Sequence, residues 1–202
     1  YNVGQAWLGP DIALGKKIAE MRSPRLRNIV YQDMRRWLPM VQTSYATWRA
    51  DHLKDKRPKG AFHTLGYLPA PVLDYLKREG VNPNTAVIIG KDTDLIHGMR
   101  DAKKNPISEK LLDNLVAEIG KPLAVYYDLQ ARKKGKHELV FVLPSDKRNM
   151  VSKVIVRVDH KAKLTAADRR HKAEGFNGFV TATEVPEKSI SNNPSSFERI
   201  WP

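Results

Sequence analysis

One stretch of the chain places a histidine beside two cations at helical spacing. Arg100 follows His97 at the third position and Lys104 at the seventh, so a helix would carry all three on one face. Histidine has an ordinary pKa close to neutral pH, and nearby cations would lower that pKa and hold a phosphate group. The chemistry indicated is proton transfer beside a phosphate. The alternative interpretation is an ordinary surface histidine.

A second candidate lies in residues 177–183, Asn-Gly-Phe-Val-Thr-Ala-Thr. A strand over this segment would place Thr181 and Thr183 on the same face, next to Asn177. Hydroxyl groups can stabilise negative charge that develops in a transition state. Alternating threonines are also common in strands for their β propensity alone, and this second reading stays open.

The elements that must position these residues fall into two parts. After the cap-like pair Ser23-Pro24, apolar and aromatic residues recur at three- and four-residue steps, which predicts a helix that Pro39 interrupts. This aromatic stripe either packs on the core of the chain or docks on a partner. Residues 52–60 are charged and end in Pro and Gly, so we place a boundary there: a basic helical arm at 1–59 and a domain at 60–202.

The second part predicts helices first and strands afterwards. Three helices are expected between residues 71 and 120, with a short β-type run at 86–89. Four strands are expected at 123–128, 138–143, 151–159 and 178–185, and a mobile basic hairpin loop at 131–136 contains Lys133. This order favours an α+β fold, with helices packed on a four-stranded, mostly antiparallel sheet.

Composition narrows the class of partner. The net charge is +13, and residues 1–59 hold 12 Lys and Arg against 5 Asp and Glu. Such a charge favours nucleic acid, although an acidic protein partner or a merely solvated basic surface would also accept it. The chain contains no cysteine, its histidines lack metal-ligand spacing, and no segment has the length of a membrane span, so we expect no metal, no cofactor and no membrane.

RNA cleavage needs little more than these residue types. A base must activate the ribose 2′-hydroxyl, cations or hydroxyls must hold the charge of the phosphorane, and an acid must protonate the leaving 5′-oxygen. Histidine, Arg or Lys, and Thr are sufficient. The substrate carries its own nucleophile, so the reaction requires no metal.

The chain resembles the barnase–EndoU–colicin–RelE (BECR) superfamily of toxin ribonucleases, in the phage-associated branch found at the C-terminus of Mu F-type head morphogenesis proteins. The resemblance covers residues 65–201 and is carried by short pieces: Leu-Gly-Tyr-Leu-Pro, Ile-Ile-Gly-Lys-Asp-Thr-Asp-Leu-Ile-His, Leu-Val-Phe-Val-Leu-Pro and Phe-Val-Thr-Ala-Thr. It implies an active site on the concave face of the sheet. It also implies that the helical histidine of the family falls on His97 and the late-strand hydroxyl on Thr181, with Thr183 as its neighbour.

The remaining site residues are chosen for their chemistry. Arg157 joins Arg100 and Lys104 as a candidate for stabilising charge. Either Tyr126 or Tyr127 offers a ring that can stack on a base, and alternation along a strand turns the other toward the core. Lys133 and Asn177 complete the expected RNA-binding set. His137, His160 and His171 are expected in or beside loops, without an assigned role.

The resemblance implies a metal-independent endoribonuclease toxin, delivered by a phage, that leaves 2′,3′-cyclic phosphate ends. The expected partners are RNA, an acidic antitoxin or immunity protein, and a capsid or portal component that the arm would contact through Trp37 and Trp48. The expected location is the phage virion or the cytoplasm of the bacterial host. Two alternatives remain: a virion protein that binds nucleic acid without cleaving it, and a degenerate toxin domain that binds an acidic partner.

Overall fold

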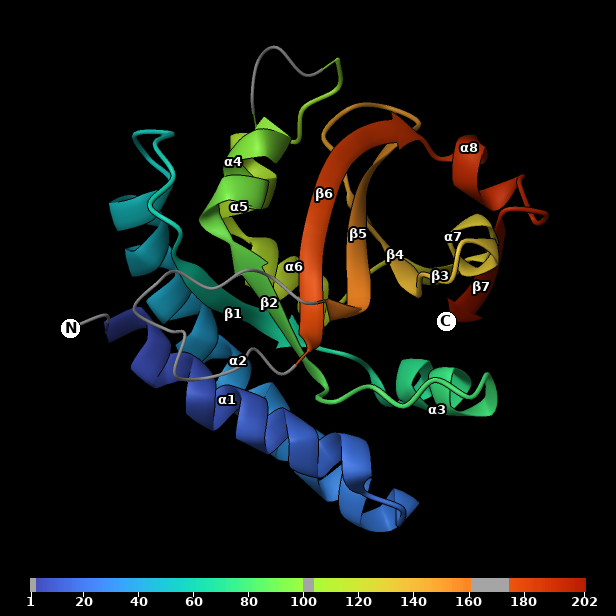
Figure 1. Cartoon of the computed structure of the whole chain (residues 1–202). Helices are drawn as coiled ribbons and strands as arrows, with labels where there is room; N and C mark the ends of the chain where they lie inside the picture. The colour runs from blue at the N-terminus through green and yellow to red at the C-terminus, as the bar shows by residue number, and fades with distance from the viewer. Residues whose placement is uncertain (1–2, 100–103, 161–174) are drawn as a thin grey trace.

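A computed structural model describes residues 3–99, 104–160 and 175–202 (Figure 1). Its strands form one seven-stranded sheet in the order β1-β2-β6-β5-β4-β3-β7. Every neighbouring pair is antiparallel except β2 and β6, which run parallel. The fold is α+β, but the prediction of a four-stranded sheet was wrong. The four predicted segments are all strands, and β1, β2 and β7 extend their sheet on both sides.

Two long helices begin the chain: α1 (Val3–Glu20) and α2 (Pro24–His52). The Ser23 hydroxyl accepts a hydrogen bond from the backbone N–H of Leu26 and caps α2, which runs through Pro39 without a break in its assignment. The buried residues of α2 belong to the same hydrophobic core as the sheet. Trp48 is buried in that core, and Trp37 packs against it half-buried. The aromatic stripe therefore packs on the chain's own core.

The middle of the chain alternates strands and helices: β1 (Phe62–Tyr67), α3 (Ala70–Arg78), β2 (Val87–Lys91) and α4 (Asp92–Met99). Residue Asp92 begins α4, and its carboxylate accepts a hydrogen bond from the backbone N–H of Thr93 at 2.6 Å. The other carboxylate oxygen accepts from the backbone N–H of Lys59 at 2.7 Å. The charged segment after α2 is thus attached to the start of α4.

The remaining elements complete the sheet. They are α5 (Glu109–Asp113), α6 (Leu115–Gly120), β3 (Ala124–Asp128), α7 (Leu129–Lys133), β4 (Glu138–Pro144), β5 (Met150–His160), β6 (Phe176–Pro186), α8 (Lys188–Ser191) and β7 (Phe197–Trp201). The first half of the expected hairpin loop at 131–136 is helical. Residues 129–133 form α7, because the Asp128 carboxylate caps its first backbone N–H groups.

The two faces of the sheet are covered differently. The inner face, which includes Leu65, Ile88 and Val156, joins α2, α3 and α6 in the main core. The outer face divides into two smaller clusters. One is Phe62, Val87, Ile89 and Phe176, with Ile12 of α1 packed on it; the other includes Tyr126, Val140 and Ile155, with Ile190 of α8. Between the parts covered by α1 and α8, the outer face carries charged side chains.

Candidate active site

A carboxylate and a guanidinium face each other on the outer face of the sheet. Glu138 of β4 lies directly opposite Arg157 of β5 in the register. The Arg157 Nε and Nη2 groups donate to Glu138 Oε1 at 3.1 and 2.8 Å. The Glu138 side chain is 14% exposed and that of Arg157 is 27% exposed. The strand register fixes this pair, and the partial burial strengthens the interaction relative to a fully solvated pair.

A histidine lies beside this pair at the end of β5. Strict alternation would place Asp159 on the face of Arg157, but the β5–β6 register shifts between Arg157 and His160, and Asp159 has φ of 51°. This irregularity returns the His160 side chain to the outer face. Its ring lies over Gly178, where an added Cβ would be 2.6 Å from the His160 Cδ2. It also contacts Phe176 edge-on, with ring centroids 6.0 Å apart.

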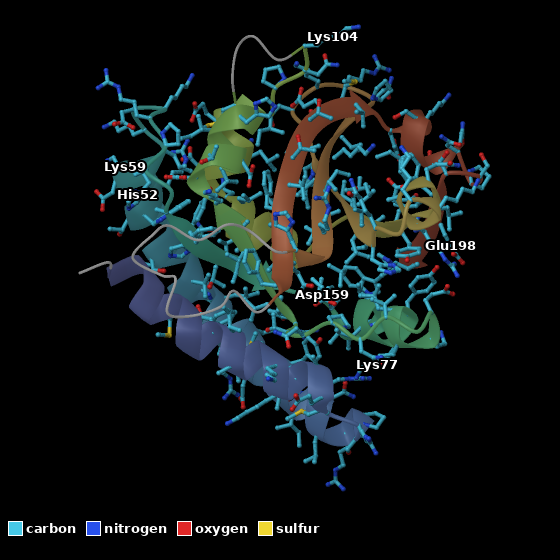
Figure 2. The ribbon with its side chains drawn as sticks, viewed as in Figure 1. His52, Lys59, Lys77, Lys104, Asp159 and Glu198 are labelled. Atoms are coloured by element: carbon cyan, nitrogen blue, oxygen red, sulfur yellow. The ribbon has the colours of Figure 1, made fainter. Side chains whose placement is uncertain are left out.

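The turn that carries His160 is fixed by a loop from elsewhere in the chain. The carboxylate of Asp159 accepts a hydrogen bond from the backbone N–H of Asn84 at 2.9 Å. The Asn84 side-chain amide donates to the carbonyl of Gly175 at 3.1 Å, just before β6. Figure 2 shows Asp159 at the foot of β6, where these segments meet. The segment before β2 therefore connects the end of β5 to the start of β6.

Electrostatics set the protonation state of the histidine. Burial lowers the pKa of His160 below its ordinary value, the Arg157 cation lowers it further, and the Glu138 carboxylate acts in the opposite direction. His160 is therefore neutral at pH 7, and its unprotonated nitrogen can accept a proton. A neutral imidazole beside a guanidinium is suited to removing a proton from a hydroxyl near a phosphate.

The structure does not place His97 and Lys104 of the predicted cluster on one helical face. His97 is exposed on α4, where it is close enough to Asp94 to affect the pKa of that carboxyl. Lys104 lies in a bend that follows α4 and is not part of the helix. Arg100 lies outside the described residues. Helix α4 packs alongside β6, with the position of an added Cβ on Gly98 3.8 Å from the carbonyl of Ala182.

The two threonines share the outer face, as alternation predicts. Thr181 lies opposite Ile155, and Thr183 lies opposite Lys153. The Thr183 hydroxyl donates to the carbonyl of Asn105 at 2.8 Å. Thr183 therefore ties β6 to the segment that follows α4, which is a structural role for a residue expected in catalysis.

Both candidate stacking tyrosines are buried. Tyr127 is 0% exposed in the main core, and its hydroxyl is 2.6 Å from His137 Nδ1. Tyr126 faces the other way, as alternation predicts, but it too is only 7% exposed. Neither ring in this arrangement offers a face to a nucleic-acid base.

Two residues that we expected to bind RNA, Asn177 and Lys133, differ in their exposure to solvent. The Asn177 side chain is 0% exposed and donates to the carbonyls of Thr85 and Val87 at 2.7 and 3.0 Å. It joins β6 to β2 and cannot contact RNA in this arrangement. Lys133, at the end of α7, is exposed and available to a polyanion.

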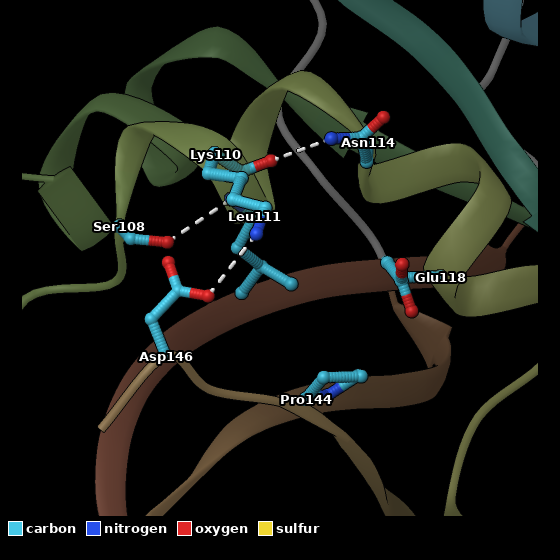
Figure 3. Close-up of a pocket in the computed structure, with 7 residues that line it drawn as sticks. All are labelled: Ser108, Lys110, Leu111, Asn114, Glu118, Pro144 and Asp146. Atoms are coloured by element: carbon cyan, nitrogen blue, oxygen red, sulfur yellow. Dashed lines mark hydrogen bonds and ion pairs between the residues drawn. The ribbon is translucent and has the colours of Figure 1, made fainter. Parts of the chain in front are cut away.

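A small pocket lies between α5, α6 and the end of β4 (Figure 3). Its lining consists of Ser108, Lys110, Leu111, Asn114, Glu118, Pro144 and Asp146. The Lys110 ammonium and the Asp146 carboxylate form an ion pair there at 3.3 Å. The Ser108 hydroxyl caps α5 by accepting from the backbone N–H of Leu111. Three polar side chains of the pocket, those of Ser108, Lys110 and Asp146, thus take part in local structure.

Sequence reasoning missed Glu138 and His160. Glu138 is the first residue of its predicted strand, and the sequence gives no pairing register that would place it opposite Arg157. His160 follows a strand and resembles a loop residue. The one available signal was Gly178, because glycine inside a strand often marks a place where another group approaches closely.

Comparisons with known proteins add no relative. No family model matches the chain, and no curated protein and no solved structure matches it significantly. The resemblance to the BECR superfamily therefore stays a prediction.

Among residues 3–99, 104–160 and 175–202, no group of three or more His, Cys, Asp or Glu side chains is arranged to hold a metal ion. No helix of the described part is long and apolar enough to cross a membrane.

Proposed function

We propose that the protein is an endoribonuclease that cleaves RNA through the outer face of its sheet. The observation that carries the proposal is the pair of Glu138 and Arg157 at facing positions of β4 and β5, with His160 three residues farther along β5 and close enough for both charges to affect its pKa. The net charge of +13 supplies a general attraction for a polyanion. This group takes the role that we had assigned to His97 from the sequence.

Each residue has a separate task in this reaction. Neutral His160 accepts the proton of a ribose 2′-hydroxyl, and the 2′-oxygen attacks the adjacent phosphorus. The guanidinium of Arg157, held in plane by Glu138, stabilises the added negative charge of the phosphorane. The bond from phosphorus to the 5′-oxygen breaks, that oxygen takes a proton from water, and the resulting hydroxide takes the proton held by His160. The products are a 2′,3′-cyclic phosphate and a 5′-hydroxyl.

The test compares two histidine variants on total bacterial RNA in the presence of EDTA. We expect wild type and His97→Ala to produce cyclic phosphate ends, and His160→Ala to be slower by about 10²–10⁴-fold, the usual contribution of a general base. His97→Ala is the matched control, since that histidine is exposed on a helix away from the ion pair. Equal cleavage by His160→Ala and wild type would contradict the proposal.

A second variant tests the guanidinium. Arg157→Lys keeps the positive charge but loses the pair of hydrogen bonds that Nε and Nη2 donate to the same oxygen of Glu138, Oε1. We expect cleavage to fall while RNA binding at low salt stays close to wild type. Unchanged cleavage would mean that Arg157 acts only through its charge or not at all.

The second candidate function is binding of nucleic acid without cleavage. The observation that favours it is the charge, which is sufficient for binding with no chemistry. In that case no variant changes product ends, because none form, and affinity falls steeply as salt increases. Binding of RNA by wild type without any cyclic phosphate product would establish this alternative.

A further inference from the structure

A serine and a histidine are hydrogen-bonded on the opposite side of the sheet from the proposed RNA site. Ser44 is exposed on α2, and His63 is in β1. The Ser44 Oγ is 2.8 Å from His63 Nε2. The second acceptor within reach of this hydroxyl, the carbonyl of Val41, is farther away at 3.4 Å. The Ser44 hydroxyl has a single proton, and the shorter distance favours its donation to His63 Nε2 over the carbonyl of Val41.

The other ring nitrogen decides which tautomer is present. His63 Nδ1 is 2.7 Å from the carbonyl oxygen of Thr64. A carbonyl oxygen can only accept, so Nδ1 carries the hydrogen and donates it. In the neutral ring, Nε2 then has the free electron pair and accepts the proton of Ser44. A nucleophile, a base and an oxygen that orients the base are thus aligned in the order used for nucleophilic catalysis.

The surroundings keep the base neutral and its ring in place. The His63 ring contacts those of Tyr45 and Trp48, with centroids 5.9 and 5.4 Å away. Burial lowers the pKa of His63, the Thr64 carbonyl opposes this, and His52 lowers it further. The His52 ring lies tilted against that of Trp48 at the end of α2, with ring centroids 5.5 Å apart (Figure 2). Protonation of His63 is therefore unfavourable at neutral pH.

We propose that Ser44 is an activated nucleophile that accepts acyl groups from activated esters, with His63 as its general base. Ser44 lies in the interior of α2, where backbone N–H groups are used by the helix and form no oxyanion hole. The site is therefore suited to capturing one acyl group per molecule, and turnover is slow.

The acyl transfer balances without any further reactant. The Ser44 oxygen forms a bond with the ester carbonyl carbon, and its proton moves to His63 Nε2. The bond between that carbon and the alcohol oxygen breaks, and the leaving alkoxide or phenolate takes the proton from His63, directly or through a water molecule. Ser44 is left as an ester and His63 is neutral again.

The test uses the full chain with p-nitrophenyl acetate, followed by mapping of acetylated residues by mass spectrometry. Thr43 and Thr47 are internal controls on the same helix, because both are exposed and their hydroxyls donate to backbone carbonyls of the helix. We expect Ser44 to be acetylated at least about tenfold faster than either threonine. We also expect its rate to rise with pH and level off near neutrality, where His63 is fully deprotonated.

His63→Gln separates general-base action from simple positioning. Glutamine can still accept the hydrogen bond of Ser44 but cannot take its proton, so we expect the acetylation rate of Ser44 to fall by about 10²-fold or more. Absence of acetyl-Ser44 in wild type, or an unchanged rate in a folded His63→Gln variant, would overturn the proposal. If His63→Gln does not fold, a wild-type rate that keeps rising above pH 8 without a plateau would overturn it instead.

Discussion

The substitution Gly178→Ala tests the position of His160, on which the proposed function depends. An added Cβ at residue 178 would lie 2.6 Å from His160 Cδ2 and 3.1 Å from both its Cβ and Cγ. The first distance is well inside van der Waals contact, so the imidazole must move. The φ of residue 178 lies outside the left-handed region, so the backbone conformation there also accepts alanine.

Two opposing effects determine the size of the change. Alanine in place of glycine in a strand interior stabilises by about 0.5–1 kcal/mol, because less backbone entropy is lost on folding. Overpacking against the imidazole costs about 1–3 kcal/mol. We therefore expect Gly178→Ala to lower the free energy of unfolding by up to about 2.5 kcal/mol. In a His160→Ala background, the only one of these three contacts that remains is that with the Cβ at 3.1 Å, and the same substitution should be neutral or stabilising.

Urea unfolding of the four proteins of this double-mutant cycle measures the difference. We expect a coupling free energy of about 1 kcal/mol or more between the two positions, with similar m-values throughout. Gly178→Ala should also slow RNA cleavage in the wild-type background, because the displaced imidazole no longer lies beside Arg157. Equal destabilisation in both backgrounds would refute the placement of His160 over Gly178, and with it the geometry of the site.

Three further predictions concern the scaffold. Gly15→Ala should destabilise the protein by at least about 1 kcal/mol in thermal or urea unfolding, although alanine has the better helix propensity. The reason is that the added Cβ on α1 would lie 2.9 Å from the backbone nitrogen of Val87. An unchanged stability would mean that α1 does not pack this closely on β2. Tyr45→Phe should cost about 1–3 kcal/mol in urea unfolding, since it leaves a buried carbonyl of α5 without its 2.8 Å hydrogen bond, and a neutral effect would contradict that bond. His63 and His160 have lowered pKa values in the folded state, so the unfolded state binds more protons just below pH 6.5. The free energy of unfolding should therefore fall as the pH decreases from 7 through 6.5 toward the folded pKa values. Unfolding measured across this range should show a smaller slope in His63→Gln, and an equal slope would argue against burial of that ring.

Local patterns in the sequence were sufficient for much of the secondary structure. Ser23 and Pro24 mark the start of α2, and the period of two along residues 151–159 gives β5 with the correct faces. These features depend on neighbours a few residues apart, and the chain records them directly. The sequence also determines the charge of +13 and the absence of cysteine, and hence the class of chemistry to consider.

Pairing between distant segments could not be predicted in the same way. No local pattern in the sequence predicts that β2 pairs in parallel with β6, which leads to a seven-stranded sheet. No local pattern predicts that β7 pairs with the edge of β3 either. The candidate active site could not be predicted for the same reason. Arg157 was identified from its residue type, but Glu138 and His160 come close to it only through the β4–β5 register and the register shift near Asp159. Residue types and local periods are written in the sequence, whereas the proximity of groups far apart along the chain is decided by how the strands pair and pack.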